Sequence, residues 1–258
     1  MGETRTLYAI AESCPFDALL VREMKRAVNA LLQLNLKRFR VPQKELAKYS
    51  ALDVTKQALE LLFEFSPSEK NYREAMRTIQ VYSEGDEEML HTIQESFRLI
   101  ANAVYDAYSG QRHAESLAPE VLFLQGVPFE PNELQQSFRF VGVRPPDISP
   151  PSVKRTIFLD EGFEPYKLLL EGTITPDKAQ KGREEHWARR IKAALNNSGP
   201  ALIRVGAEHV NSTKSVIVKS LSGIRRSGPG KLPKILQREG IVIEIVHSIP
   251  DVNEVYGK

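Results

Sequence analysis

The apolar positions of this chain follow two different spacings. Short, nearly continuous apolar runs occur at 6–11, 201–205 and 241–246. Such runs are typical of strands that are buried on both faces of a parallel sheet. Between the first run and residue 109 the apolar residues recur every three or four positions instead, which predicts helices.

Residues 13–109 are therefore expected to be largely helical. The apolar spacing predicts three helices, near 20–34, 52–65 and 89–104. The sequence Ser-Pro-Ser-Glu at 66–69 is a start signal for a further helix, with a cap at Ser66, proline at the first helical position and glutamate at the third. We expect that helix to run to about Tyr82.

The segment 110–165 is irregular by composition. It contains the proline pairs 145–146 and 150–151, which favour irregular chain with short extended pieces. Within it, 121–124 and 138–141 are expected to be strands or loops that cover the core. The segment is interpreted as a connection wrapped within one domain, or as a lid over a site. A passive linker between two domains is the alternative.

The second half, 166–258, has the pattern of an α/β unit. A helix that begins at 175–177 should carry Arg183, and a short helix near 232–238 lies between the two last apolar runs. Strand, helix and strand in this order suggest parallel pairing in a covered sheet. The predicted fold class is α/β, a mostly parallel sheet flanked by helices, with a helical N-terminal portion and a proline-rich connection, in one domain over 1–258.

Composition and charge exclude several classes. The chain is 41% hydrophobic and 26% charged, as in ordinary globular proteins. A formal net charge of +2 does not imply nucleic acid as a partner of the whole protein. We expect no membrane span and no secretory signal, so a cytoplasmic location is the default, with delivery by a dedicated secretion system left open. A single cysteine, Cys14, excludes an internal disulfide framework.

Arg183 is the first candidate site residue. It shares one stripe of its helix with three apolar residues, Trp187, Ile191 and Leu195. An arginine that faces inward needs acceptors for its five N–H donors, so we expect it to be buried and to contact a carboxylate or a carbonyl. It could pair with Glu12 or Glu208, or hold a substrate anion. A purely structural ion pair is the alternative.

Glu12 and His209 each follow an apolar strand, and Glu208 lies beside His209. Histidine at a strand end can ligate a metal or move protons near neutral pH. If both strands lie parallel in one sheet, the two side chains emerge at the same edge, within roughly 10 Å of each other. The alternatives are a loop histidine without a role and a Glu12 that caps the helix starting near Phe16.

The segment 214–238 holds seven basic residues and no acidic one. Its centre alternates glycines with cations, which can approach and pair an anion, so Arg225, Arg226 and Lys231 are anion-binding candidates. Lys231 is followed by leucine, which excludes a P-loop. A solvated loop is the alternative. The chain has no HExxH sequence and no cysteine pair, the spacings that indicate zinc.

Two motifs resemble those of the erythromycin esterase-like, ChaN-like and TraB/Tiki-like superfamily. Residues 183–188, Arg-Glu-Glu-His-Trp-Ala, are similar to its helical arginine motif. Residues 205–209, Val-Gly-Ala-Glu-His, are similar to its strand that ends in Gly-x-x-His. The strand at 7–15 resembles the first strand of that family, with Ala11 at the position of a glycine and Pro15 at that of a histidine.

The resemblance implies an α/β fold whose sheet edge hydrolyses substrates or binds a divalent metal or haem. One expected function is hydrolysis of an ester or amide bond, with His209 as base or metal ligand, Glu12 as a second base or ligand, and Arg183 holding the developing anion. The ligand would be a small molecule or a peptide, and an anionic ligand is one of the expected kinds. The other expected function is that of a non-catalytic binding protein on the same scaffold, which the missing histidine at Pro15 favours.

Overall fold

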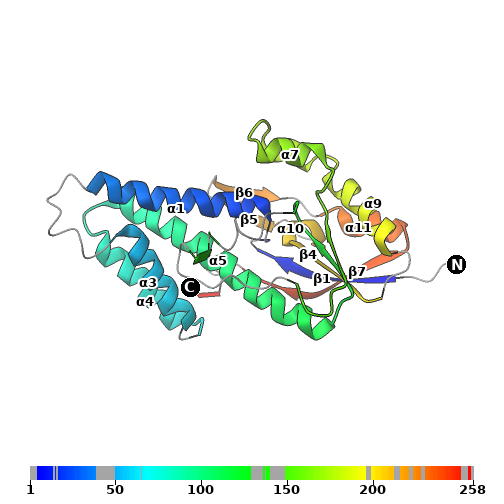
Figure 1. Ribbon diagram of the computed structural model, residues 1–258, viewed down its shortest axis with the longest axis horizontal. Helices are drawn as coiled ribbons and strands as arrows, with labels where there is room; N and C mark the ends of the chain where they lie inside the picture. The colour runs from blue at the N-terminus through cyan, green and yellow to red at the C-terminus, as the bar shows by residue number, and fades with distance from the viewer. Residues whose placement is uncertain are drawn as a thin grey trace. The chain divides into compact units, whose positions relative to one another are not determined.

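The computed structural model divides the chain into two compact units (Figure 1). It describes residues 5–13, 15, 17–38, 50–64, 66–128, 136, 138–139, 149–195, 199–211, 216–220, 223–227, 230–250 and 255–256, with backbone alone for 35–38, 216–220 and 223–227. The first unit comprises Met1–Leu20, Asp106–Phe129 and Pro146–Ile249, and the second comprises Val21–Tyr105, Glu130–Pro145 and Pro250–Lys258. The single domain expected over 1–258 stays a prediction.

A five-stranded parallel sheet forms the centre of the first unit. Its strands are β1 (Arg5–Glu12), β2 (Val121–Leu124), β3 (Arg155–Phe158), β4 (Ala201–Gly206) and β7 (Ile241–Ser248). They lie in the order β3-β2-β4-β1-β7, and each neighbouring pair runs parallel. The predicted strands at 6–11, 201–205 and 241–246 are therefore confirmed, and 121–124, expected to be a strand or a loop, is a strand. The strand β3 was missed because Arg155 and Thr156 interrupt its apolar pattern.

Helices flank this sheet, so the predicted α/β class is confirmed. On one face, α9 (Arg183–Leu195) and α11 (Leu232–Arg238) pack against alternate strand residues, among them Leu7, Phe123 and Val205 (Figure 1). On the other face, the C-terminal part of α5 (Glu87–Leu117) comes so close that a Cβ on Gly110 would collide with the Arg204 guanidinium. Because both faces are covered, the strands carry apolar residues at successive positions.

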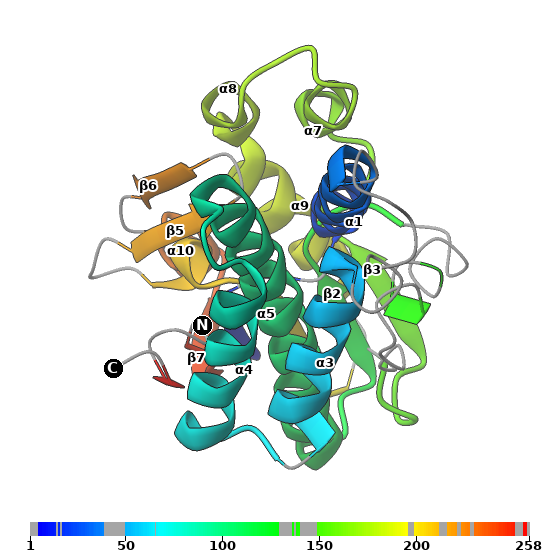
Figure 2. The same cartoon turned by 90° about the vertical axis from the view of Figure 1, so that its left-hand side faces the viewer.

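Two short helices, α7 (Glu164–Leu170) and α8 (Pro176–Gln180), precede α9 and pack side by side around Tyr166 (Figure 2). The prediction that one helix begins at 175–177 and carries Arg183 is wrong. Gly182 has φ +77°, a left-handed conformation that ends α8 before α9 begins.

The second unit is helical, as expected. It contains most of α1 (Ala18–Arg38) and of α5, together with α3 (Ala51–Glu64) and α4 (Glu69–Tyr82), which pack on each other. The helices predicted near 20–34, 52–65 and 89–104 and the end of α4 at Tyr82 are confirmed. The cap of α4 is Ser68 rather than Ser66, because the Ser68 hydroxyl accepts from the Asn71 N–H at 3.2 Å.

The segment 110–165 is more regular than predicted. Helix α5 continues to Leu117, and both β2 and β3 lie within the segment. Phe138 is buried and has helical backbone, as does Arg139, so an extended piece beginning there is excluded. The residues 140–148 lie outside the described chain. None of the helices in the described residues is long and apolar enough to cross a membrane.

The basic segment is not a plain loop. It contains the strands β5 (Val216–Ser220) and β6 (Gly223–Ser227), which pair antiparallel, with Val216 opposite Ser227 and Ser220 opposite Gly223. This register leaves two residues in the connection, the commonest length for a hairpin. The helix predicted near 232–238 follows as α11.

Candidate functional site

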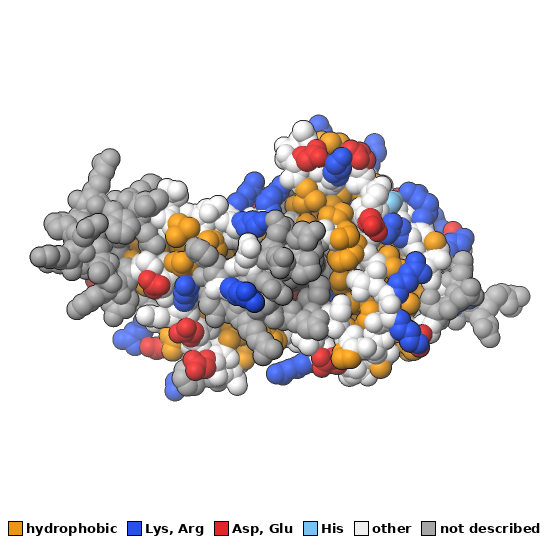
Figure 3. All heavy atoms as spheres, viewed as in Figure 1, with side chains coloured by type: hydrophobic (Ala, Val, Ile, Leu, Met, Phe, Trp, Pro, Cys, Tyr) orange, Lys and Arg blue, Asp and Glu red, His pale blue; other side chains and the backbone are white. Residues whose placement is uncertain are grey.

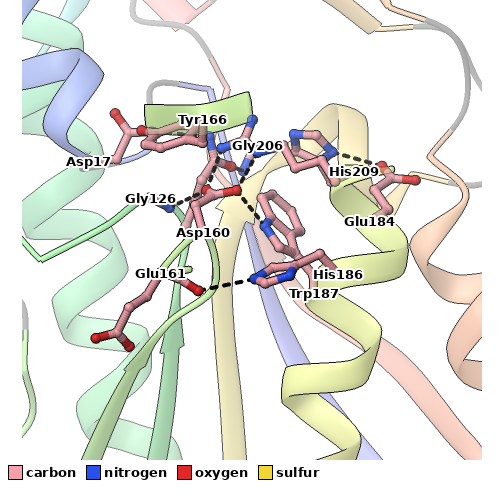
Figure 4. A network of polar contacts seen from close by, with 12 residues as sticks. Asp17, Gly126, Asp160, Glu161, Tyr166, Glu184, His186, Trp187, Gly206 and His209 are labelled. Carbon is pink, nitrogen blue, oxygen red and sulfur yellow. Dashed lines mark hydrogen bonds and ion pairs between the residues drawn. The ribbon is translucent and has the colours of Figure 1, made fainter. Parts of the chain in front are cut away.

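The centre of the candidate site is a buried ion pair between Arg183, at the start of α9, and Asp160, which follows β3 (Figure 4). Arg183 Nε and Nη2 donate to Asp160 Oδ1 and Oδ2 at 2.7 and 2.6 Å. The Asp160 carboxylate also accepts from Trp187 Nε1 at 2.7 Å and from the Gly126 N–H at 2.8 Å. A bidentate pair of this kind fixes both side chains in orientation.

Aromatic rings enclose the Arg183 guanidinium. Its central carbon lies 4.8 Å from the centre of the Tyr166 ring and 4.6 Å from that of Trp187, within cation–π distance. Burial by itself lowers the pKa of Arg183, but the charge and hydrogen bonds of Asp160 outweigh it and raise that pKa. The guanidinium is therefore a permanent cation whose charge is met by Asp160.

Asp17 joins three elements at the same edge of the sheet. Its Oδ1 accepts from the Leu20 N–H at 3.0 Å and so caps α1. Its Oδ2 accepts from the Tyr166 hydroxyl at 3.1 Å and from Gln125 Nε2 at 3.3 Å. Gln125 in turn accepts from the Gly206 N–H through Oε1 at 2.9 Å. The ends of β2 and β4 are thereby tied to α1 and α7.

Burial raises the pKa of the Asp17 carboxyl above its usual 3.8, while the Leu20 N–H and the Arg183 charge oppose that rise. Burial and the Asp17 charge likewise raise the pKa of Tyr166 well above 10, so the hydroxyl stays protonated and donates a hydrogen bond to Asp17. The stability that Asp17 contributes is thus fully present below pH 3.8 and is lost as pH rises through its folded-state pKa.

We therefore expect the parent to lose stability relative to Asp17→Asn as pH rises above about 4. The loss in free energy of unfolding should be ~1.36 kcal/mol for each unit by which the pKa of Asp17 in the folded protein exceeds that in the unfolded protein. Asparagine does not titrate, so its own packing cost is the same at every pH. Urea titrations of both proteins from pH 4 to 8 measure this difference. A difference that is constant across the range would contradict a raised pKa for Asp17.

His209 lies in the short helix α10 (Ala207–Val210) directly after β4. Its Nδ1 is 2.7 Å from Glu184 Oε1, and its ring meets the Trp187 ring edge-on with centroids 4.5 Å apart (Figure 4). The other oxygen of Glu184 accepts from the Lys231 N–H at 2.7 Å. Because the carboxylate accepts and does not donate, Nδ1 is the donor of this contact, and in the neutral imidazole the lone pair is then on Nε2.

The Nε2 atom of His209 is buried and has no hydrogen-bond partner among the described residues, although the side chain is only 3% exposed. The nearest carboxylate oxygen is Glu208 Oε1 at 3.7 Å, too far for a hydrogen bond. A buried polar atom without a partner costs free energy, and a catalytic role is one physical reason for such an atom to persist. Nε2 of His209 is therefore a buried basic nitrogen that accepts no hydrogen bond from the described residues.

Glu12 lies at the same edge as His209 but is committed elsewhere. The register pairs Glu12 with Gly206, so the predicted adjacency of the two strand ends is confirmed. The Glu12 carboxylate faces Arg204, with Arg204 Nε at 2.8 Å and Nη2 at 2.6 Å from Oε1. That pair lies on the α5 side of the sheet, where Gly110 meets Arg204. Asp17 rather than Glu12 caps the first helix.

The expected partners of Arg183 were wrong, although its burial against a carboxylate is confirmed. It contacts Asp160, and neither Glu12 nor Glu208 hydrogen-bonds to it. The reason is the alternation of strand side chains: Glu12 lies on the α5 face of the sheet, whereas Arg183 starts the helix that covers the other face. A role for Arg183 in holding a substrate anion is therefore weakened.

The described residues do not fit the metal centre that the resemblance implies. Among them, no group of three or more His, Cys, Asp or Glu side chains is arranged to hold a metal ion. Cys14 lies outside the described residues. We derive no step through a metal or haem.

A pair of histidines elsewhere in the first unit was also missed. His113 of α5 and His247 of β7 stack with ring centroids 3.5 Å apart, and His113 Nδ1 is 2.9 Å from the Ser109 carbonyl oxygen. Burial and, after it, the charge of His113 lower the pKa of His247. Face-to-face rings direct their nitrogens sideways rather than toward one shared ion, so this pair is a packing contact.

Sequence reasoning missed five residues of the site, Asp17, Gln125, Asp160, Tyr166 and Glu184. Two of them carried a signal: Gln125 follows the apolar residues 121–124 and Asp160 follows the apolar residues 157–159, the same strand-end position that singled out Glu12. The side chains of the other three meet their partners through contacts between elements that are far apart in sequence.

Comparison with known proteins adds no family to this geometry. No family model, no curated protein and no solved structure matches the chain. The function is therefore inferred from the residues at the edge of the sheet.

Proposed function

We propose that the protein hydrolyses an ester or amide bond, with His209 as the general base. The observation that supports this is the buried, unpartnered Nε2 of an imidazole whose Nδ1 is held by Glu184. A carboxylate that orients histidine in this way also stabilises the imidazolium formed during catalysis. The α/β scaffold and the resemblance to the erythromycin esterase-like and TraB/Tiki-like superfamily agree with this activity.

In the proposed reaction, Nε2 takes a proton from a water molecule as the water oxygen bonds to the substrate carbonyl carbon. The carbonyl electrons move to its oxygen. When they return, the C–O or C–N bond to the leaving group breaks, and the imidazolium gives its proton to that group. Glu184 is a positioning residue, itself held by the Lys231 N–H. Arg183 and Asp160 fix Trp187, against which the imidazole packs.

A non-catalytic binding protein is the second candidate, and one observation favours it. The strongest charges at this edge of the sheet satisfy each other, Arg183 with Asp160 and Arg204 with Glu12. Charges that are paired within the protein are not available to a reacting substrate, which favours a non-catalytic role. Measured turnover discriminates between these two candidates.

The test uses p-nitrophenyl esters and peptide p-nitroanilides, with release of the chromophore as the readout. We expect His209→Gln to lower kcat/KM about 100-fold, because general-base catalysis contributes at least that much. Glu184→Gln should lower kcat with little change in KM, since it acts through His209. His186→Gln is the matched control: His186 lies on α9, the helix of Glu184, and its Nε2 is 3.1 Å from the Glu161 carbonyl oxygen. Equal activity of parent and His209→Gln, or no turnover by the parent, contradicts the proposal.

A further inference from the structure

The hairpin formed by β5 and β6 starts and ends beside His209. The Gly230 N–H donates to the Asn211 carbonyl at 2.8 Å, which closes the base of the hairpin next to α10. The following residue, Lys231, donates its N–H to Glu184. A Cβ on Gly230 would collide with the His209 carbonyl oxygen, so the two backbones touch there. The base of the hairpin is therefore next to His209, the proposed general base.

The segment 214–238, which contains the hairpin and α11, has a charge opposite to that of the remaining chain. The seven basic residues between 214 and 238 are accompanied by no acidic one, and the whole chain has a net charge of +2. Subtracting these seven charges leaves −5 for the rest of the protein. The face shown in Figure 3 carries Lys and Arg as well as Asp and Glu side chains. A short anionic ligand is attracted to the basic segment.

The backbone of the hairpin offers a second kind of contact. Among the strands that the structure describes, β5 and β6 pair only with each other. Each therefore has an outer edge whose N–H and C=O groups the ribbon itself does not use. An extended peptide can add to such an edge as a further strand, and its main-chain hydrogen bonds supply affinity. Nucleic acid has no matching row of alternating donors and acceptors.

We propose that the β5–β6 hairpin binds an acidic peptide segment as an added strand and presents it to His209. That this peptide is the substrate rests on the proposed function, but its binding does not. Arg225 and Arg226 occupy the register positions opposite Val218 and Ile217 in the middle of the ribbon. They are the two cations within β6, and because successive residues of a strand point to opposite faces, one of them shares a face with the glutamates of an added strand.

The test is fluorescence anisotropy with a fluorescein-labelled ten-residue peptide of alternating glutamate and valine. We expect Arg225→Ala/Arg226→Ala to raise Kd about tenfold or more, and raising the salt from 50 to 300 mM to weaken parent binding steeply, because exposed charges are screened. The matched control is Arg73→Ala/Arg77→Ala, which removes two exposed charges from α4. Its affinity should equal that of the parent. Equal weakening in both double variants overturns the proposal, as does a parent that binds no peptide.

Two further probes separate strand addition from charge alone. A peptide of the same sequence with N-methyl groups on alternate residues keeps its charge and loses N–H donors, so it should bind at least tenfold more weakly. Equal binding of that peptide, or tighter binding of a ten-nucleotide single strand, overturns the inference. His209→Gln distinguishes the two proposals: lost turnover with retained peptide binding supports both. If His209→Gln still hydrolyses the ester, only the proposal of hydrolysis is contradicted. If the parent hydrolyses the ester but binds no peptide, only the proposal of a peptide site on the hairpin is contradicted.

Discussion

Replacing Arg183 with alanine is expected to lower the free energy of unfolding by about 3–5 kcal/mol. The side chains of Arg183 and Asp160 are 2% and 0% exposed, so the substitution leaves an ionised carboxylate in a dry environment. Asp160 would keep its bonds from Trp187 and Gly126, which lessen the loss without replacing a positive charge. Urea unfolding at pH 7, followed by circular dichroism, measures the change.

A matched control for this prediction lies on the same helix. Arg190 pairs with Glu161 at 2.6 Å, but the two side chains are 28% and 57% exposed, so Arg190→Ala should cost no more than about 1 kcal/mol. Asp160→Asn should destabilise about as much as Arg183→Ala, since it leaves the guanidinium without its charge partner. Coincident unfolding curves for Arg183→Ala and the parent would show that the pair does not form.

Replacing Glu12 with alanine is the other large effect that we expect, again about 3–5 kcal/mol of lost stability. Its carboxylate and the Arg204 guanidinium are 2% and 1% exposed, and Arg204 is held between the sheet and Gly110 of α5. Alanine removes the negative charge and leaves the guanidinium enclosed. Glu12→Gln keeps the size of the side chain, so its free energy of unfolding should lie between those of Glu12→Ala and the parent.

The exposed pair Lys154–Glu120 is the control for Glu12. Its side chains are 72% and 39% exposed at a distance of 2.8 Å, so Lys154→Ala should change stability by less than about 1 kcal/mol. Turnover of the p-nitrophenyl esters tests the other role assigned to Glu12. A Glu12→Gln variant with parental stability and a 100-fold lower kcat would make Glu12 a catalytic residue and contradict the structural role.

The secondary structure was largely predictable because burial leaves a local imprint on the sequence. A strand covered on both faces must be apolar at successive positions, as at 201–205, and a helix covered on one side must be apolar every three or four. For the same reason α4 ends at Tyr82 and α11 spans Leu232–Arg238, as expected. The hairpin was missed because basic residues and glycines within 216–227 hide its alternation.

The site was less predictable, because its pairs join elements that are remote in sequence. The helical stripe predicted that Arg183 is buried and needs a carboxylate, and both are observed. Several acidic residues could be the partner of Arg183, and Asp160 is the one that pairs with it because of where β3 ends. His209 was found from its strand end, whereas its partner Glu184 is visible only once α9 lies against α10.

The sequence by itself determined the α/β class, the places of most strands and helices, the inward face of α9 and the meeting of the ends of β1 and β4 at one sheet edge. Each of these follows from periodicity or from parallel strand order, which are properties of short stretches. Only the tertiary structure decided which charges pair, because pairing depends on the face to which each strand residue points and on the helix packed there. Arg183 therefore lies with Asp160, Arg204 with Glu12, and the imidazole of His209 keeps one nitrogen uncommitted.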